Sequence, residues 1–193
     1  EFGKNFKKIV GHTLGLYAKS FNPFYFGEKK LEKQTIDFAC LSNFVALKGG
    51  AIKKEQFLSA HMADIFSNIY FAHAVRWYNK QNNISSVLTD YCVERLMNEN
   101  NEKINTVINN YPNLRLFLWH LKSNVKTENY NEKRKILKEI NENPKIMDFI
   151  KEDVFTEGTI LEDLERLNIL DSESDEYKNL YNKVISVGEF KNF

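Results

Sequence analysis

The stretch MADIFSNIYFAHAVRWY, residues 62–78, decides the fold class. At 100° per residue its apolar side chains fall on nearly every side of a helix, and no apolar/polar alternation competes with that period. A helix that is apolar all round is typical of a central helix packed by neighbours on several faces. The sequence therefore predicts an all-α helical bundle with a long central apolar helix, about 51–80, and an additional C-terminal helical segment.

Helical spacing continues upstream of this stretch. Residues 2–19 fit an amphipathic helix, and an aromatic connection containing Pro23 follows it. A second helix is expected over about 28–48. Gly49 and Gly50 supply its stop, because glycine adopts the left-handed cap conformation at little cost.

Downstream of the central helix the same period predicts shorter elements. Ser85 or Ser86 is expected to cap a helix that the polar residues 98–102 interrupt before 104–108. Further helices are expected from Pro112 and over about Asn131 to Ile140. Pro144 is expected to open a short turn through Ile150. Two more helical segments are expected after a cap at Thr159 and after a capping box of Ser172 with Asp175, the last ending near Gly188.

These elements suggest three segments. Residues 1–27 form a basic amphipathic helix and its aromatic linker, and residues 28–111 form the core of the bundle. Residues 112–193 contribute further helices that complete the bundle and are partly an insertion. Because the chain opens on Glu1 rather than on Met, we expect it to be part of a longer protein.

Composition narrows the classes of function. Of 193 residues 42% are hydrophobic and 13% aromatic, and the formal net charge is +1, so no basic excess favours nucleic acid as a partner. No uncharged apolar run is long enough for a membrane span, and no signal-peptide pattern is present. Cys40 and Cys92 have no Cys-x-x-Cys spacing, which favours free thiols and a reducing compartment.

No motif in the sequence predicts catalytic machinery or a metal site. His61, Asp64 and Asn68 share one helical face, which could begin a metal site, but no cysteine or second histidine completes a tetrahedral ligand set. A polar stripe that faces a neighbouring helix is the alternative. No glycine-rich phosphate loop or nucleophile elbow occurs, so we expect no catalytic, cofactor-binding or metal-binding residues.

The first helix carries the candidate docking residues. An apolar sector with lysines opposite is the pattern that inserts into a membrane interface near anionic head groups. The alternative is that the same sector packs on the protein's own core. The candidate membrane- or partner-docking residues are Phe2, Lys4, Phe6, Lys7, Lys8, Ile9, Val10 and Leu14.

Several short stretches occur in the order known from one family. They are Glu55-Gln56-Phe57-Leu58, Ala63-Asp64-Ile65, Asn68-Ile69-Tyr70, Ala72-His73-Ala74-Val75 and Tyr91-Cys92-Val93-Glu94. This order resembles the extra C-terminal helical domain of very-long-chain acyl-CoA dehydrogenases and of their complex I assembly relative. The resemblance covers about residues 10–97 and could extend to the last helix around Tyr177–Val187, whereas residues 112–170 have no counterpart in it.

The resemblance implies a non-catalytic domain. In that family FAD, the acyl-CoA thioester and the catalytic glutamate belong to upstream domains, which oxidise the thioester to trans-2-enoyl-CoA in fatty-acid β-oxidation. The domain would then serve subunit packing, in a homodimer with upstream dehydrogenase domains, and docking on the matrix side of the inner mitochondrial membrane. An all-α interaction or scaffold subunit of a larger mitochondrial assembly, without dehydrogenase activity, is the alternative.

One short motif allows a third hypothesis about function. Glu157-Gly158-Thr159 matches the Glu-Gly-Thr that carries the base in such dehydrogenases. It lacks the Arg-Asp that precedes that motif in the family, and it follows the tail-domain pattern rather than preceding it. We interpret it as a chance match, and an active fragment with Glu157 as its base is the weaker alternative.

Overall fold

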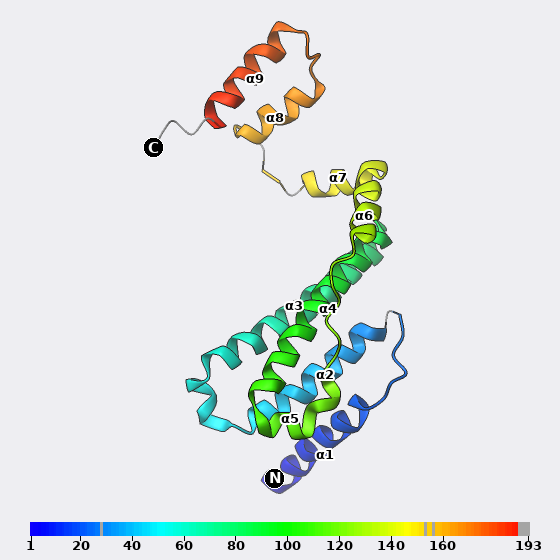
Figure 1. Ribbon diagram of the computed structural model, residues 1–193, viewed down its shortest axis with the longest axis vertical. Helices are drawn as coiled ribbons and strands as arrows, with labels where there is room; N and C mark the ends of the chain where they lie inside the picture. The colour runs from blue at the N-terminus through cyan, green and yellow to red at the C-terminus, as the bar shows by residue number, and fades with distance from the viewer. Residues whose placement is uncertain (28, 153, 156, 189–193) are drawn as a thin grey trace. The chain divides into compact units, whose positions relative to one another are not determined.

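The computed structural model describes residues 1–27, 29–152, 154–155 and 157–188, with the backbone alone at Phe2, Val187 and Gly188. The regular structure of these residues is helical (Figure 1), which confirms the all-α prediction. The chain divides into two compact units, residues 1–144 and 145–193, which are described separately. The helices of the first unit are α1 (Phe2–Ser20), α2 (Lys29–Ala46), the 3-10 helix η1 (Gly49–Lys54), α3 (Gln56–Asn82), α4 (Ser86–Asn110), α5 (Pro112–Leu118), the 3-10 helix η2 (Trp119–Leu121) and α6 (Tyr130–Glu142).

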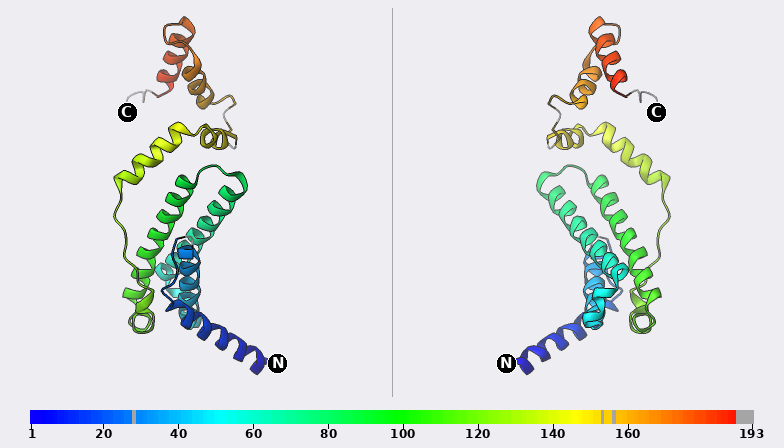
Figure 2. Two further views of the ribbon diagram at one scale, coloured as in Figure 1. Left: turned by 90° about the vertical axis from the view of Figure 1, so that its right-hand side faces the viewer. Right: turned by 90° about the vertical axis from the view of Figure 1, so that its left-hand side faces the viewer.

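The core of the first unit lies where α2, α3, α4 and α5 meet. α3 and α4 form an antiparallel pair joined by a short connection (Figure 2), and α2 packs against both. Burying these aliphatic side chains supplies the main drive for the packing, because each fully buried one contributes roughly 1.5–3 kcal/mol. The buried cluster consists of Cys40, Leu41, Val45, Leu58, Ile65, Ile69, Ile104, Val107, Ile108, Leu114, Leu118 and Leu121.

The expected stop after the second helix is confirmed. α2 ends at Ala46, and Gly49 follows with φ +56°, in the left-handed region that glycine adopts without steric cost. Glu28, at the expected start of this helix, lies outside the described residues. Residues 51–54, which we expected in the third helix, belong to η1 instead, and α3 begins at Gln56.

The prediction that the third helix is packed on several faces is wrong for these residues. α3 buries Leu58, Ile65, Ile69 and Ala72 against its neighbours. Its opposite side is exposed, although it is equally apolar. The reason is that α2, α4 and η1 all approach the same face of α3, and no other described element of the first unit covers the far side.

The predicted interruption of the fourth helix is also wrong. α4 runs unbroken through residues 98–102 because Asn100, which is fully buried, hydrogen-bonds to the neighbouring helices. Its Nδ2 donates to Gln34 Oε1 at 3.0 Å, and its Oδ1 accepts from Asn68 Nδ2 at 3.0 Å. A polar side chain that is buried with partners of this kind stabilises the helix that carries it. The N-cap at Ser85 is confirmed, since its Oγ accepts from Leu88 N at 3.2 Å.

The second unit contains α7 (Pro144–Glu152), whose first residue closes the first unit, α8 (Ile160–Ile169) and α9 (Asp175–Gly188). The prediction of a short turn from Pro144 through Ile150 is wrong, because these residues form the helix α7, and proline is well tolerated at the first position of a helix. The Thr159 cap of α8 is confirmed. The predicted position of the N-cap of α9, Ser172, is wrong by two residues. Ser174 caps this helix instead, since its Oγ accepts a hydrogen bond from Tyr177 N at 3.1 Å. An ion pair of 2.7 Å between Lys183 Nζ and Asp163 Oδ2 joins α8 to α9.

Candidate functional site

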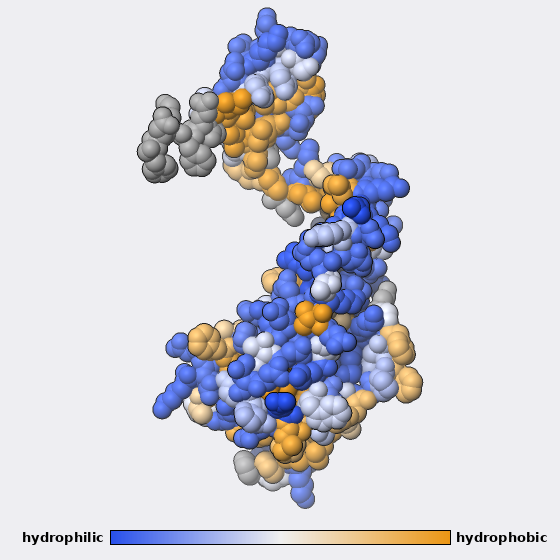
Figure 3. Space-filling model, viewed as in Figure 1, coloured by the Kyte–Doolittle hydropathy of each residue, from blue (hydrophilic) through white to orange (hydrophobic). Residues whose placement is uncertain are grey.

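The candidate docking residues lie on the part of α1 that extends past the other helices of the first unit (Figure 2). Orange, apolar surface follows this helix along the lower edge of Figure 3. The side chain of Phe2 lies outside the described part of the chain. The other apolar candidates expose much of their surface: 57% for Phe6, 64% for Ile9, 40% for Val10 and 62% for Leu14, and Lys4, Lys7 and Lys8 are exposed too.

The last turns of α1 anchor the helix to the bundle. Leu16 and Tyr17, on the same apolar sector as Phe6 and Ile9, are half-buried. The Tyr17 ring lies 5.7 Å from the ring of Phe44 on α2, and its hydroxyl donates to the carbonyl of Phe117 at 3.0 Å. One continuous apolar sector is therefore core at its C-terminal end and exposed at its N-terminal end.

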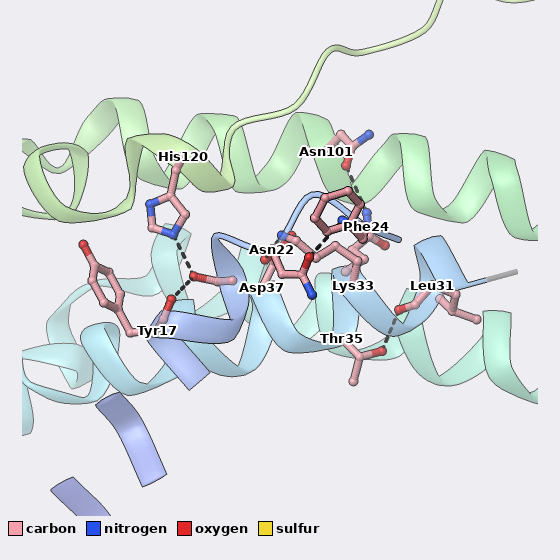
Figure 4. A network of polar contacts seen from close by, with 11 residues as sticks. Tyr17, Asn22, Phe24, Leu31, Lys33, Thr35, Asp37, Asn101 and His120 are labelled. Carbon is pink, nitrogen blue, oxygen red and sulfur yellow. Dashed lines mark hydrogen bonds and ion pairs between the residues drawn. The ribbon is translucent and has the colours of Figure 1, made fainter. Parts of the chain in front are cut away.

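A serine–histidine contact completes the anchor. His120 Nε2 lies 2.7 Å from Ser20 Oγ, and the Phe21 ring stacks on the imidazole at 3.7 Å between centroids. Figure 4 shows His120 reaching toward the end of α1, beside Tyr17. Burial, then the charge of Lys33, lowers the pKa of His120, with the nearby Phe117 carbonyl opposing them.

This pair is not built as a nucleophile and its base. Ser20 Oγ also lies 2.6 Å from the Tyr17 carbonyl, which can only accept, so the single hydroxyl proton is donated there. His120 Nε2 must then donate to Ser20, whereas a general base would accept the hydroxyl proton. Its buried Nδ1 has no hydrogen-bond partner among the described residues. We interpret the contact as a structural link between α1 and η2.

A polar cleft of about 280 Å³ opens between α2, α4 and the segment that follows η2. Lys33 and Asp37, one turn apart on α2, form an ion pair at its wall (Figure 4). Burial raises the pKa of Asp37 from 3.8 to about 6, although the hydrogen bond and the charge of Lys33 act in the opposite direction. The remaining lining residues are Tyr25, Lys30, Gln34, Glu94, Met97, Asn98, Asn101, Ile104, Leu121, Ser123 and Lys126.

The polar face of α3 is a stripe against α4 rather than the start of a metal site. Asp64 Oδ2 accepts from Lys103 Nζ at 2.9 Å, and Asn68 bonds to Asn100. The described residues gather no group of three or more His, Cys, Asp or Glu side chains that could hold a metal ion. Within the same residues no helix combines the length and hydropathy needed to cross a bilayer.

Glu157-Gly158-Thr159 forms the turn that starts α8. Gly158 has φ +69°, and its N–H donates to Glu162 Oε2 at 2.7 Å. Thr159 Oγ1 accepts from Leu161 N at 3.2 Å, so the threonine and Glu162 together satisfy N–H groups at the helix start. Glu157 itself is exposed in this turn.

Sequence reasoning missed a second exposed surface, the outer face of α3. Five aromatic residues on this face are exposed to solvent. Their exposed fractions are 60% for Phe66, 64% for Tyr70, 55% for Phe71, 63% for Trp77 and 43% for Tyr78. A signal was available in the sequence: across 57–78 the formally charged residues are Asp64 and Arg76 alone, whereas a solvent-facing helix surface is normally more charged.

Comparison with known proteins agrees with this architecture. The family model described as "Acyl-CoA dehydrogenase, C-terminal, bacterial type" matches residues 7–190, which is nearly the whole chain. The match runs through α1 to α9, including residues 112–170. No curated protein and no solved structure matches the chain. The chain therefore belongs to the bacterial-type acyl-CoA dehydrogenase C-terminal domain family.

Proposed function

We propose that this domain is the non-catalytic tail of a larger FAD-dependent acyl-CoA dehydrogenase and that α1 docks the enzyme on an anionic membrane surface. The parent would oxidise long acyl-CoA thioesters in fatty-acid β-oxidation, as in the very-long-chain enzymes or their complex I assembly relative. In this proposal the anionic surface is the matrix side of the inner mitochondrial membrane. Family membership supports the association with dehydrogenase domains.

The exposed part of α1 is the observation that carries the docking role. Four apolar side chains, Phe6, Ile9, Val10 and Leu14, expose between 40% and 64% of their surface. Burying the exposed fractions in a membrane interface would contribute about 5 kcal/mol, at roughly 1.5–3 kcal/mol for each fully buried side chain. The three lysines add about 1 kcal/mol each near anionic lipid.

Together these contributions amount to about 8 kcal/mol before the cost of immobilising the protein. A net free energy of that size would correspond to a dissociation constant of about 1 μM, so with the cost of immobilisation subtracted we expect binding weaker than micromolar. Because the last turns of α1 are anchored by Tyr17 and Ser20, the exposed turns are held away from the bundle and are available to a flat surface.

Two clefts among the described residues, compared with what FAD needs, do not fit it. The cleft of about 280 Å³ lies just below the roughly 300–1,000 Å³ of ligand pockets, and a dinucleotide needs more room than most ligands. A wider groove of about 800 Å³ along α4 and residues 125–134 is lined mainly by charged and amide side chains, whereas cofactor pockets are mostly apolar. The proposal therefore places the flavin in upstream domains, as the family resemblance implies, and assigns no chemical step to this domain.

Co-sedimentation with vesicles tests the docking role. The purified chain is mixed with cardiolipin-containing vesicles and with neutral phosphatidylcholine vesicles, at low and at high salt. We expect binding to the anionic vesicles that weakens as salt rises, because salt screens the lysines. Phe6→Glu/Ile9→Glu should reduce binding about a thousandfold, since roughly 3 kcal/mol of burial is lost and two charges are repelled at about 1 kcal/mol each.

The matched control makes the same exchanges elsewhere. Phe155→Glu/Ile169→Glu changes two side chains of the same types that expose 75% and 85% of their surface in the second unit. This control should bind anionic vesicles like the wild type. Equal loss in both variants, or wild-type chain that stays in the supernatant, would refute the docking role. The domain would then serve packing against dehydrogenase domains or act as a scaffold subunit.

A further inference from the structure

We infer that residues 122–127 form a strap that lifts from α4 as one unit, uncovers the cleft at Asp37, and lifts more readily once that carboxyl is ionised. The strap connects η2 to α6 and lies along α4 (Figure 2). Leu121, buried in the core, fixes one end, and the hydrogen bond from Ser85 to Glu139 on α6 fixes the other. The inference concerns a different part of the first unit from the docking helix α1 and does not depend on the proposed function.

Two asparagine side chains of α4 hold the strap by its backbone. Asn98 Nδ2 donates to the carbonyl of Lys126 at 2.9 Å, and its Oδ1 accepts from the N–H of the same residue at 2.6 Å. Asn105, two turns further along α4, makes the same two bonds to Ser123, at 2.7 Å and 3.2 Å. Between these two clamps, Asn101 Nδ2 lies 3.5 Å from a further strap carbonyl. An amide that donates and accepts in this way binds the peptide backbone and makes no demand on the strap side chains.

Little apolar packing holds the strap closed. Residues 122–127 are all exposed, and Val125, their one aliphatic residue, exposes 45% of its surface. The two strap lysines contact Glu94 and Asn109 of α4 at 3.2 Å and 2.8 Å, at exposed positions where such contacts contribute little. A segment with few buried apolar contacts and with solvent-exposed hydrogen bonds opens at a low free energy. The strap should therefore lift while the helices beneath it stay folded.

The strap covers the cleft in which Asp37 lies. Ser123 and Lys126 line this cleft of about 280 Å³ together with Asp37. The Asp37 carboxyl pairs with Lys33, and burial still raises its pKa to about 6. Lifting the strap lets water reach the carboxyl, and hydration favours its ionised form. The closed form therefore holds the proton, and opening should increase as pH rises through 6.

Other titratable groups surround the pair of Asp37 and Lys33 on each neighbouring element. They are Lys30 and Cys40 on α2, Tyr25 on the connection before α2, Glu94 on α4, His120 on η2 and Lys126 on the strap. Histidine is the type among them that ordinarily titrates near this range, and burial, then Lys33, lowers the pKa of His120. Asp37→Asn separates the two contributions, because it removes the carboxyl and keeps the histidine.

Hydrogen exchange of the full chain, measured at single backbone amides, tests whether the strap opens as one unit. In wild type the Ser123 amide should exchange at least tenfold faster than the amide of Ile104, in the buried core of α4. Asn98→Ala removes only the clamp on Lys126, yet it should lower the protection of Ser123 about threefold to fivefold, because each of the two lost bonds contributes a factor of about two. Asn110→Ala, at an asparagine whose side chain bonds within α4, should leave Ser123 unchanged.

A pH series tests the link to Asp37. After correction for the intrinsic exchange rate, the protection of Ser123 should fall between pH 5 and pH 7.5, by at most about tenfold for a carboxyl whose pKa moves from about 6 to 3.8 on opening. Asp37→Asn should remove most of this pH dependence, whereas Asp64→Asn, at an exposed carboxyl, should keep it.

Three results would overturn the inference. The first is a Ser123 amide that exchanges only as fast as Ile104, since the whole unit would then have to unfold. The second is a Ser123 protection that Asn98→Ala leaves unchanged, since the clamps would then open separately. The third is a pH dependence that is absent from wild type or equally large in Asp37→Asn.

Discussion

The raised pKa of Asp37 predicts an unusual dependence of stability on pH. Its carboxyl is 11% exposed, and burial raises its pKa from 3.8 to about 6 despite the adjacent Lys33. Between these two values the folded state holds the proton and the unfolded state does not. The free energy of unfolding therefore falls as pH rises through this window, by about 3 kcal/mol in full.

The measurement compares wild type with Asp37→Asn, which keeps the shape of a protonated carboxyl. Urea unfolding between pH 5 and pH 8 avoids the acid range in which Glu55 and Asp64 contribute. Hydrogen bonds from Tyr111 and Lys103, respectively, lower the pKa values of these two carboxyls, so their stabilisation is complete above the ordinary pKa and is lost as pH falls below it. We expect Asp37→Asn to gain about 1–2 kcal/mol relative to wild type between pH 5 and pH 8, mostly below pH 7.

Asp64→Asn is the control, because it makes the same exchange at an exposed carboxyl whose pKa is lowered. Its difference from wild type should stay constant from pH 5 to pH 8. A constant difference for Asp37→Asn as well would refute the reasoning, since it would mean that Lys33 compensates fully for the burial of the carboxylate.

Two further predictions concern buried polar and thiol groups. Asn100→Leu should lower the free energy of unfolding by about 2–3 kcal/mol, because a buried acceptor and a buried donor lose their partner, whereas Asn98→Leu at the rim should cost less than 1 kcal/mol. Urea unfolding measures both, and equal losses would contradict the argument. Burial raises the pKa values of the Cys40 and Cys92 thiols, so both should react with a disulfide reagent at least about tenfold more slowly than free cysteine in the native state and rapidly in urea. Native reaction at the rate of free cysteine would show that the packing around them opens.

Local sequence signals determined the elements of this fold. The 3.6-residue period predicted helices throughout, and the caps at Ser85 and Thr159 and the left-handed Gly49 lie where the sequence predicted them. These features depend on contacts within about four residues, so the local sequence contains the information that specifies them. Ser172 shows the limit of such signals, because Ser174, two residues on, has an equally suitable hydroxyl and caps the helix instead.

Tertiary structure decided which surfaces are used. The polar residues 98–102 predict a helix break when the local sequence is considered alone. The helix continues because Gln34 and Asn68, from distant parts of the chain, form hydrogen bonds with Asn100. The apolar sector of α1 is uniform in sequence, but only its last turns meet α2 and η2. α3 is apolar on every side, and the approach of α2 and α4 alone selects the face that is buried. Periodicity gives the faces of a helix, whereas burial depends on elements far away in the chain, which local sequence does not specify.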